Sequence, residues 1–158
     1  MSQAHRSIKK YTVDAIIVYG PEKELEVLAK LAQSGKEIDW KPAIILSATY
    51  LEKFGTDRLK QFFEKKKLNF GKSLEKLSLP QVATLLYGLD LIKPAHFTQI
   101  KQIWAERRRI IHVKRHLPAY VGLEANRKYG KWIQNTLRVI EYLKKEMENN
   151  GFKRKEKP

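Results

Sequence analysis

The chain has 158 residues and no cysteine, and its 32 lysines and arginines against 17 aspartates and glutamates give a formal net charge of +15. The absence of cysteine excludes disulfides, zinc-thiolate sites, iron-sulfur clusters and cysteine nucleophiles. This length is typical of one domain that buries about two-thirds of the surface its unfolded form exposes.

The sequence contains no apolar run of the ~18 residues that a membrane-spanning helix needs, and its first residues lack the apolar segment of a signal peptide. We therefore expect a cytoplasmic protein with no membrane partner. The excess of positive charge favours a polyanion, and RNA, DNA and an acidic surface are the candidates. Surplus lysine can also serve solubility alone.

The N-terminal residues, 1–38, are expected to form a basic arm and an accessory helix. Residues 1–10 are polar and basic, as in a loose arm. The β-branched run 11–19 fits a short strand and a buried helical turn equally well. Pro21 suits the first position of a short helix, which is expected to end near Gly35.

A second helix is expected after Asp39, a candidate cap, because apolar residues recur at helical spacing over 43–54. The Gly-Thr-Asp segment 55–57 is predicted to interrupt or kink this helix. The lysine run 65–67 fits a solvated helix end, where cations favour the negative terminus of the helix dipole.

The next two helices are expected to form a hairpin. Ser78 and Gln81 have the Ser-x-x-Gln form of a capping box, so a helix should begin at Leu79 and reach Leu89. The turn 90–95 then leads into a helix that ends near His112. On this second helix one broad apolar stripe is predicted from Phe97, Ile100, Ile103, Trp104, Ile110 and Ile111.

The last helix is predicted to begin at Gly122 and to end at Gly151, with Glu141 placed four residues before Lys145 as a helical ion pair. Residues 151–158 read as a disordered basic tail. The fold class is therefore all-α, and we expect 39–150 to form an up-and-down bundle of about five helices.

Arg107 lies near the middle of the predicted apolar stripe. An unpaired guanidinium in an apolar seam costs several kcal/mol. Arg107 must therefore pair with an acid such as Glu52 or Glu141, or the seam must open onto a cleft or a subunit interface. In the first case its role is structural.

Most catalytic patterns are missing. The four histidines have no carboxylates at ligand spacing, which argues against a metal site, and no glycine-rich phosphate loop or dinucleotide fingerprint suggests a cofactor. Cleavage of RNA without a metal needs a base for the ribose 2′-hydroxyl and fixed positive charge at the phosphate. Histidine and arginine supply both functions, although a basic helix end can also only bind phosphates.

The segment 107–112 resembles the signature of the HEPN superfamily (higher eukaryotes and prokaryotes nucleotide-binding), which is an arginine, four to six residues and a histidine near the end of an amphipathic helix. The helical pattern over 39–147 is similar too. The resemblance implies a helical bundle that forms a homodimer with two motifs facing across a cleft, and a metal-independent endoribonuclease activity. Many such proteins are toxins paired with a nucleotidyltransferase antitoxin, or act in phage defence.

Carried onto this chain, the resemblance implies that Arg107 stabilises the phosphate and His112 acts on the 2′-hydroxyl. Arg109 and His116 also fit the spacing, with six residues between them. We prefer Arg107 because its place in the stripe aims it at a subunit seam. The residues expected to bind RNA around this site are Arg108, Arg109, Lys114, Arg115 and His116.

Two alternatives remain open. The same fold can serve as a catalytically inactive module that binds RNA or a protein partner. The segments 79–89 and 97–108 also fit a helix-turn-helix, in which the second helix would enter a DNA major groove and its arginines would meet phosphates or guanines.

Overall fold

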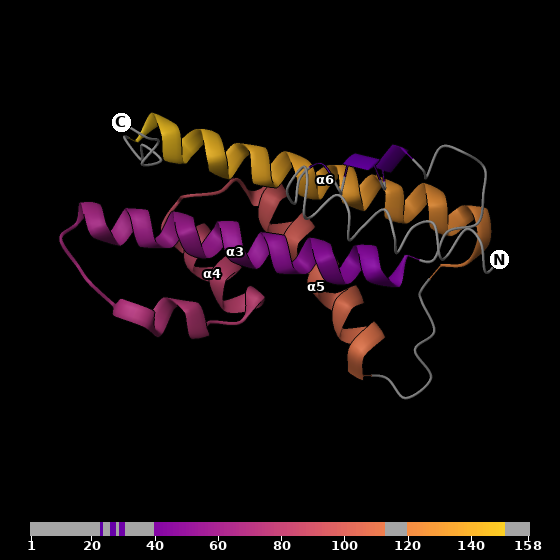
Figure 1. Ribbon diagram of the computed structural model, residues 1–158, viewed down its shortest axis with the longest axis horizontal. Helices are drawn as coiled ribbons and strands as arrows, with labels where there is room; N and C mark the ends of the chain where they lie inside the picture. Colours follow the sequence, from indigo (N-terminus) through magenta and orange to yellow (C-terminus); the bar gives the residue numbers. More distant parts are fainter. Residues whose placement is uncertain (1–22, 24–25, 28, 31–39, 113–119, 151–158) are drawn as a thin grey trace.

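The computed structural model describes residues 23, 26, 27, 29, 30, 40–112 and 120–150 (Figure 1). Over these residues it contains helices and no strand, which confirms the all-α class. No described helix is long and apolar enough to cross a membrane. The elements are α3 (Lys41–Lys65), the 3-10 helix η1 (Gly71–Lys76), α4 (Leu79–Gly88), α5 (Pro94–His112) and α6 (Gly122–Asn149).

Helix α3 is central and contacts every other element in this set. It lies beside α6, and the two helices run in the same direction (Figure 1). Near their beginnings, Trp40 Nε1 donates to Asn126 Oδ1 at 2.8 Å. Near their ends, Gln61 Nε2 donates to the Met147 carbonyl at 2.7 Å. The up-and-down order expected from the sequence therefore does not hold for these two helices.

The parallel arrangement results from the connection after α3. This connection returns along α3 instead of leading directly into an antiparallel neighbour, and Lys60 Nζ meets Glu75 Oε1 of η1 at 2.6 Å. Helix α5 then runs antiparallel to α6. The ring of His96, near the start of α5, lies 4.6 Å from the ring of Tyr142 in the second half of α6, measured between ring centres. Glu106, near the end of α5, accepts a hydrogen bond from Tyr129 in the first half of α6. The lengths of the connections in the sequence did not predict that the chain returns along α3 after residue 65.

Helix α3 continues without a break through Gly55, so the predicted interruption at 55–57 is wrong. A Cβ built on Gly55 would lie 2.6 Å from Val82 Cγ1 and 3.2 Å from Leu86 Cδ1. Gly55 therefore permits the close approach of α4 to α3. The tertiary contact, and not a turn, explains this glycine.

Other predicted helix limits agree with the structure. Helix α4 begins at Leu79, and the Gln81 side chain accepts a hydrogen bond from the Ser78 backbone N–H at 2.9 Å, as a capping box requires. Lys145 pairs with Glu141 at 3.1 Å. The candidate cap Asp39, the run 11–19 and the tail 151–158 lie outside the described residues.

The core fills the space between these helices. Its largest side chains that are almost fully buried are Tyr129, Ile44, Leu51, Leu59, Leu79, Leu86, Ile100, Ile103, Ile133, Ile140 and Leu143. Every long helix contributes to this set, which makes 40–112 and 120–150 one packed unit.

Candidate functional site

Helix α5 carries the candidate residues, and its buried face positions them. Ile100, Ile103 and Ile110 are buried as predicted, but Ile111 is 41 % exposed. The buried set is completed instead by Glu106, which is only 4 % exposed. The buried face of α5 is therefore rotated about the helix axis relative to the predicted stripe. The prediction placed Ile111 in the core because its side chain is apolar, whereas the contact with α6 places Glu106 there.

The Glu106 carboxylate is tied to α6 through Tyr129. The Tyr129 hydroxyl donates to Glu106 Oε1 at 3.0 Å and accepts from the Tyr120 backbone N–H at 3.1 Å. A buried carboxylate requires such partners, because desolvating an unpaired charge costs several kcal/mol. Sequence reasoning missed Glu106, although its spacing of three from Ile103 and four from Ile110 was a usable signal.

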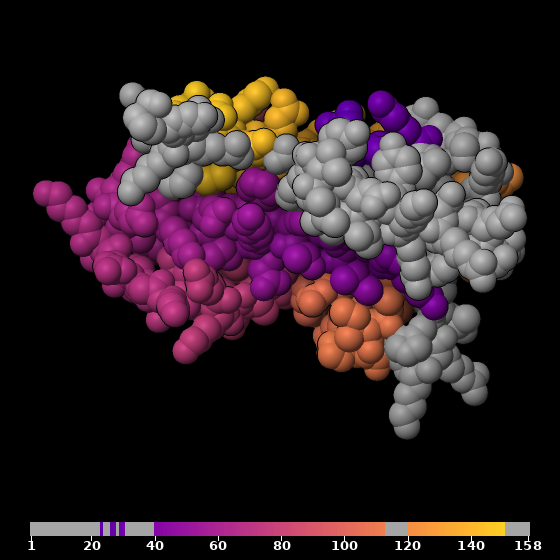
Figure 2. Space-filling model, in the orientation of Figure 1, coloured from indigo at the N-terminus to yellow at the C-terminus, as the bar shows by residue number. Residues whose placement is uncertain are grey.

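Arg107 is half-buried and points into a groove of about 540 Å³ beneath α3. Figure 2 shows this recess between the atoms of α5 and those of η1 and α4. Among the described residues, no group accepts a hydrogen bond from the buried Arg107 Nε. The groove is lined by Thr49, Glu52, Lys53, Thr56, Asp57, Lys60, Glu75 and Arg107.

Acidic and basic groups alternate in this groove. Its lining contains the three carboxylates of Glu52, Asp57 and Glu75, against two lysines and Arg107. A hydrogen bond from Lys60 lowers the pKa of Glu75, and burial raises the pKa of Asp57 above its ordinary value. The groove is therefore electrostatically balanced, and it is no simple anion site within one copy of the chain.

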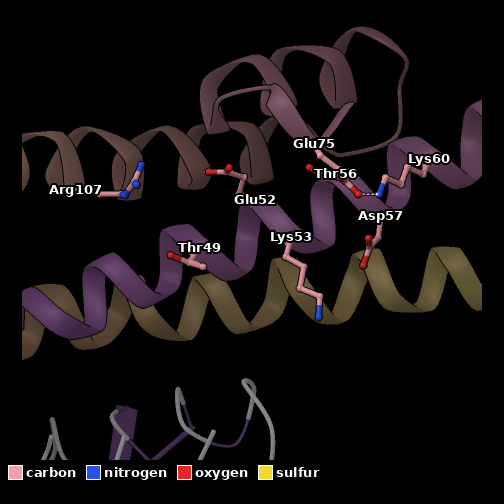
Figure 3. A pocket seen from close by; sticks show the side chains of 8 residues that line it. All are labelled: Thr49, Glu52, Lys53, Thr56, Asp57, Lys60, Glu75 and Arg107. Carbon is pink, nitrogen blue, oxygen red and sulfur yellow. Dashed lines mark hydrogen bonds and ion pairs between the residues drawn. The ribbon is translucent and has the colours of Figure 1, made fainter. Parts of the chain in front are cut away.

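The structure distinguishes the two acids that the sequence offered as partners of Arg107. Glu141 is exposed and pairs with Lys145 on α6. Glu52 lines the groove with Arg107, and in Figure 3 its side chain extends from α3 towards the guanidinium. Within the described part of the chain no ion pair closes between Arg107 and Glu52. The guanidinium thus has an acidic neighbour without a direct salt bridge.

The other candidate cations lie on the solvent side of α5. Arg108, Arg109 and His112 are all exposed. Arg108 Cζ lies 5.5 Å from the centre of the Trp104 ring, in a cation-π contact. At roughly 100° per residue, Arg107 and His112 project about 140° apart, so one copy of α5 presents them on different faces.

Lys114, Arg115 and His116 lie outside the described residues, so the alternative pair of Arg109 with His116 has no described geometry. No cluster of three histidine, aspartate or glutamate side chains suited to a metal ion occurs within the described ranges. Within the part of the chain that the structure describes, the candidate site therefore consists of the cationic end of α5 and the groove that Arg107 enters.

No protein-family model, curated protein or solved structure matches this chain. The fold and the site define it as an all-helical, strongly basic protein with a cationic helix end beside a charged groove.

Proposed function

We propose that this protein binds RNA and cleaves it without a metal, as an endoribonuclease of the HEPN type. The observation that carries the proposal is the C-terminal end of α5, where Arg108, Arg109 and His112 are exposed together. Among the described residues none of these three side chains forms an ion pair, and exposed cations of this kind can replace the counterions of a phosphate backbone. The net charge of +15 adds long-range attraction for the same partner.

The proposed chemistry assigns one role to each side chain. The neutral His112 imidazole takes the proton of a ribose 2′-hydroxyl, and the freed oxygen attacks the adjacent phosphorus. The Arg107 guanidinium stabilises the added negative charge on the phosphoryl oxygens. The 5′-oxygen leaves and takes up a proton from water, which yields a cyclic phosphate and a free 5′-hydroxyl, and the His112 imidazolium releases its proton to solvent.

In this proposal, a second copy of the chain is needed to bring an arginine and a histidine to the same phosphate. Arg107 and His112 of one helix diverge by about 140°, so the pair facing one phosphate would come from two subunits. A homodimer that joins the ends of two α5 helices would bring Arg107 of one subunit near the His112 imidazole of the other. It would also cover the half-buried guanidinium, whose Nε is without a hydrogen bond among the described residues.

The activity is tested with purified protein, EDTA and labelled single-stranded and structured RNA. We expect cleavage by the wild type, and a rate at least ~100-fold lower for His112→Ala and for Arg107→Ala. Arg138→Ala is the matched control, because Arg138 is an exposed arginine on α6 rather than α5. Cleavage that continues unchanged in His112→Ala would remove this residue as the base.

The composite site is tested by mixing the two inactive variants. If each site takes Arg107 from one subunit and the histidine from the other, random exchange restores about a quarter of wild-type activity, since half of the dimers carry one intact site. Sedimentation must show a dimer in the same buffer. A dimer whose mixed subunits remain inactive would contradict the shared site.

A non-catalytic RNA-binding module is the second candidate, and the acidic lining around Arg107 favours it. Glu52, Asp57 and Glu75 share the groove with the guanidinium and lower its availability to a phosphate. RNA binding without cleavage by any preparation would support this reading. Salt-dependent binding to duplex DNA with sequence preference, and no RNA cleavage, would instead favour the helix-turn-helix.

A further inference from the structure

Aromatic rings and cations alternate along one side of α5. Phe97, Lys101, Trp104 and Arg108 are spaced by four, three and four residues. At roughly 100° per residue their side chains project within about 60° of one another. They therefore form a straight row that extends for about 16 Å along the helix and leads towards its last turn.

The rings and cations in this row contact each other in pairs. The Lys101 ammonium lies 5.2 Å from the centre of the Phe97 ring, and Arg108 repeats the contact on Trp104 at 5.5 Å. Helix α4 adds Tyr87, whose ring stacks on Phe97 with centres 4.7 Å apart and planes 19° from parallel. We call Tyr87, Phe97, Lys101, Trp104 and Arg108 the ring-cation row.

The ring-cation row is accessible to a partner. Tyr87 is 44 % exposed, Lys101 and Arg108 are exposed, and Phe97 and Trp104 are half-buried. A half-buried ring has its orientation held by the bundle while part of it still meets solvent. The two cations are on flexible side chains, so they can leave the ring faces at little cost.

We propose that the ring-cation row binds single-stranded RNA, with bases stacked on Tyr87 and Trp104 and the phosphates between them held by Lys101 and Arg108. The choice of RNA as the polyanion rests on the proposed function. On binding, Arg108 moves from the Trp104 ring to a phosphate and a base takes its place, while Lys101 leaves the Phe97 ring for the neighbouring phosphate and a second base stacks on the exposed Tyr87 ring. The strand is thereby led along α5 towards His112.

The chemistry of the ring-cation row favours a single strand over a duplex. Stacking requires an unpaired base whose face is free, and paired bases in an A-form helix are already stacked on their neighbours. Aromatic stacking with interleaved cations is the usual means of binding single strands without sequence preference. A duplex could meet only the two cations in this row.

Binding is measured by fluorescence anisotropy with a single-stranded RNA of twelve nucleotides and a duplex of equal length, in a His112→Ala background that prevents cleavage. We expect Trp104→Ala and Tyr87→Ala each to weaken single-strand binding about tenfold and duplex binding less than twofold. Lys101→Gln should make the slope of log affinity against log salt shallower by about 0.7.

Two matched controls lie away from the ring-cation row. Phe70 is an exposed aromatic residue beside η1, and Lys131 is an exposed lysine on α6. Phe70→Ala and Lys131→Gln remove one ring and one charge, so they should change single-strand affinity less than twofold. If the two controls weaken single-strand binding as much as Trp104→Ala or Lys101→Gln does, any exposed ring or charge would have the same effect, and the inference would be overturned.

Folding and function are separated in the same experiment. If Trp104→Ala loses its helical signal, Lys101→Gln and Arg108→Gln decide, because both side chains are exposed and neither substitution disturbs the core. Ring-dependent binding without any RNA cleavage would reject the nuclease and keep the ring-cation row. Cleavage with unchanged binding by all the row variants would do the reverse.

Discussion

Glu106 on α5 and Tyr129 on α6 hydrogen-bond at 3.0 Å inside the bundle. Tyr129 is 1 % exposed and Glu106 is 4 % exposed, so this contact replaces water around a carboxylate. Glu106 directly precedes Arg107 in the chain. The bond therefore helps to set the rotation of α5, and with it the direction in which Arg107 enters the groove.

Tyr129→Phe should lower the free energy of unfolding by about 2 kcal/mol, because a hydrogen bond to a buried charged group is lost. Urea denaturation followed by circular dichroism measures the change. Tyr87→Phe removes a hydroxyl from an exposed ring and should change stability by less than about 0.5 kcal/mol. Equal effects of the two variants would mean that the Glu106 contact contributes nothing.

Gly55→Ala should destabilise the protein by about 1–2 kcal/mol, because its new Cβ would approach the stiff Val82 side chain to 2.6 Å. Helix propensity alone predicts the opposite sign, a gain of about 1 kcal/mol. Gly88→Ala on α4 is the control, since its Cβ would meet nothing within 4 Å, and it should be neutral or stabilising. Adding Val82→Ala to Gly55→Ala should recover part of the loss.

His96 should make stability depend on pH. Burial, and then the charge of Lys93, lower the pKa of His96 from its ordinary value of 6.5. The Lys93 backbone N–H also donates to Nδ1 at 3.3 Å, which requires that nitrogen to be unprotonated. The folded state thus binds fewer protons than the unfolded state as pH falls through about 6.5, and stability is lost in that direction.

The measurement compares wild type with His96→Phe, which keeps a ring beside Tyr142 and cannot titrate. Between pH of about 7.5 and about 5, the wild type should lose about 0.5 kcal/mol more than the variant, a figure reduced for solvent screening. Identical pH profiles would show that this imidazole has the same proton affinity in both states.

Glu52→Gln should tighten RNA binding about two- to threefold, because it removes an acid that shares the groove with Arg107. Glu141→Gln, at an exposed position of α6, changes the net charge by the same amount and should have a smaller effect on RNA binding. Anisotropy with labelled RNA compares the two variants. Weaker binding together with a loss of stability above about 1 kcal/mol would assign Arg107 a structural role towards Glu52.

Local sequence signals predicted the helices well. Ser78 and Gln81 specified the start of α4, and the predicted start of α6 at Gly122 also agrees with the structure. These features depend on hydrogen bonds and side chains within one or two turns, so the sequence contains what is needed to infer them.

The sequence by itself determined that this protein is helical and basic, and that α5 ends in a group of arginines and a histidine. Only the tertiary structure decided that α3 and α6 run parallel, that Gly55 serves a close helix contact and that Glu106 replaces Ile111 in the core. The physical reason is that helical periodicity fixes relative angles along one helix, whereas the direction of its inner face is set by the neighbours that pack against it.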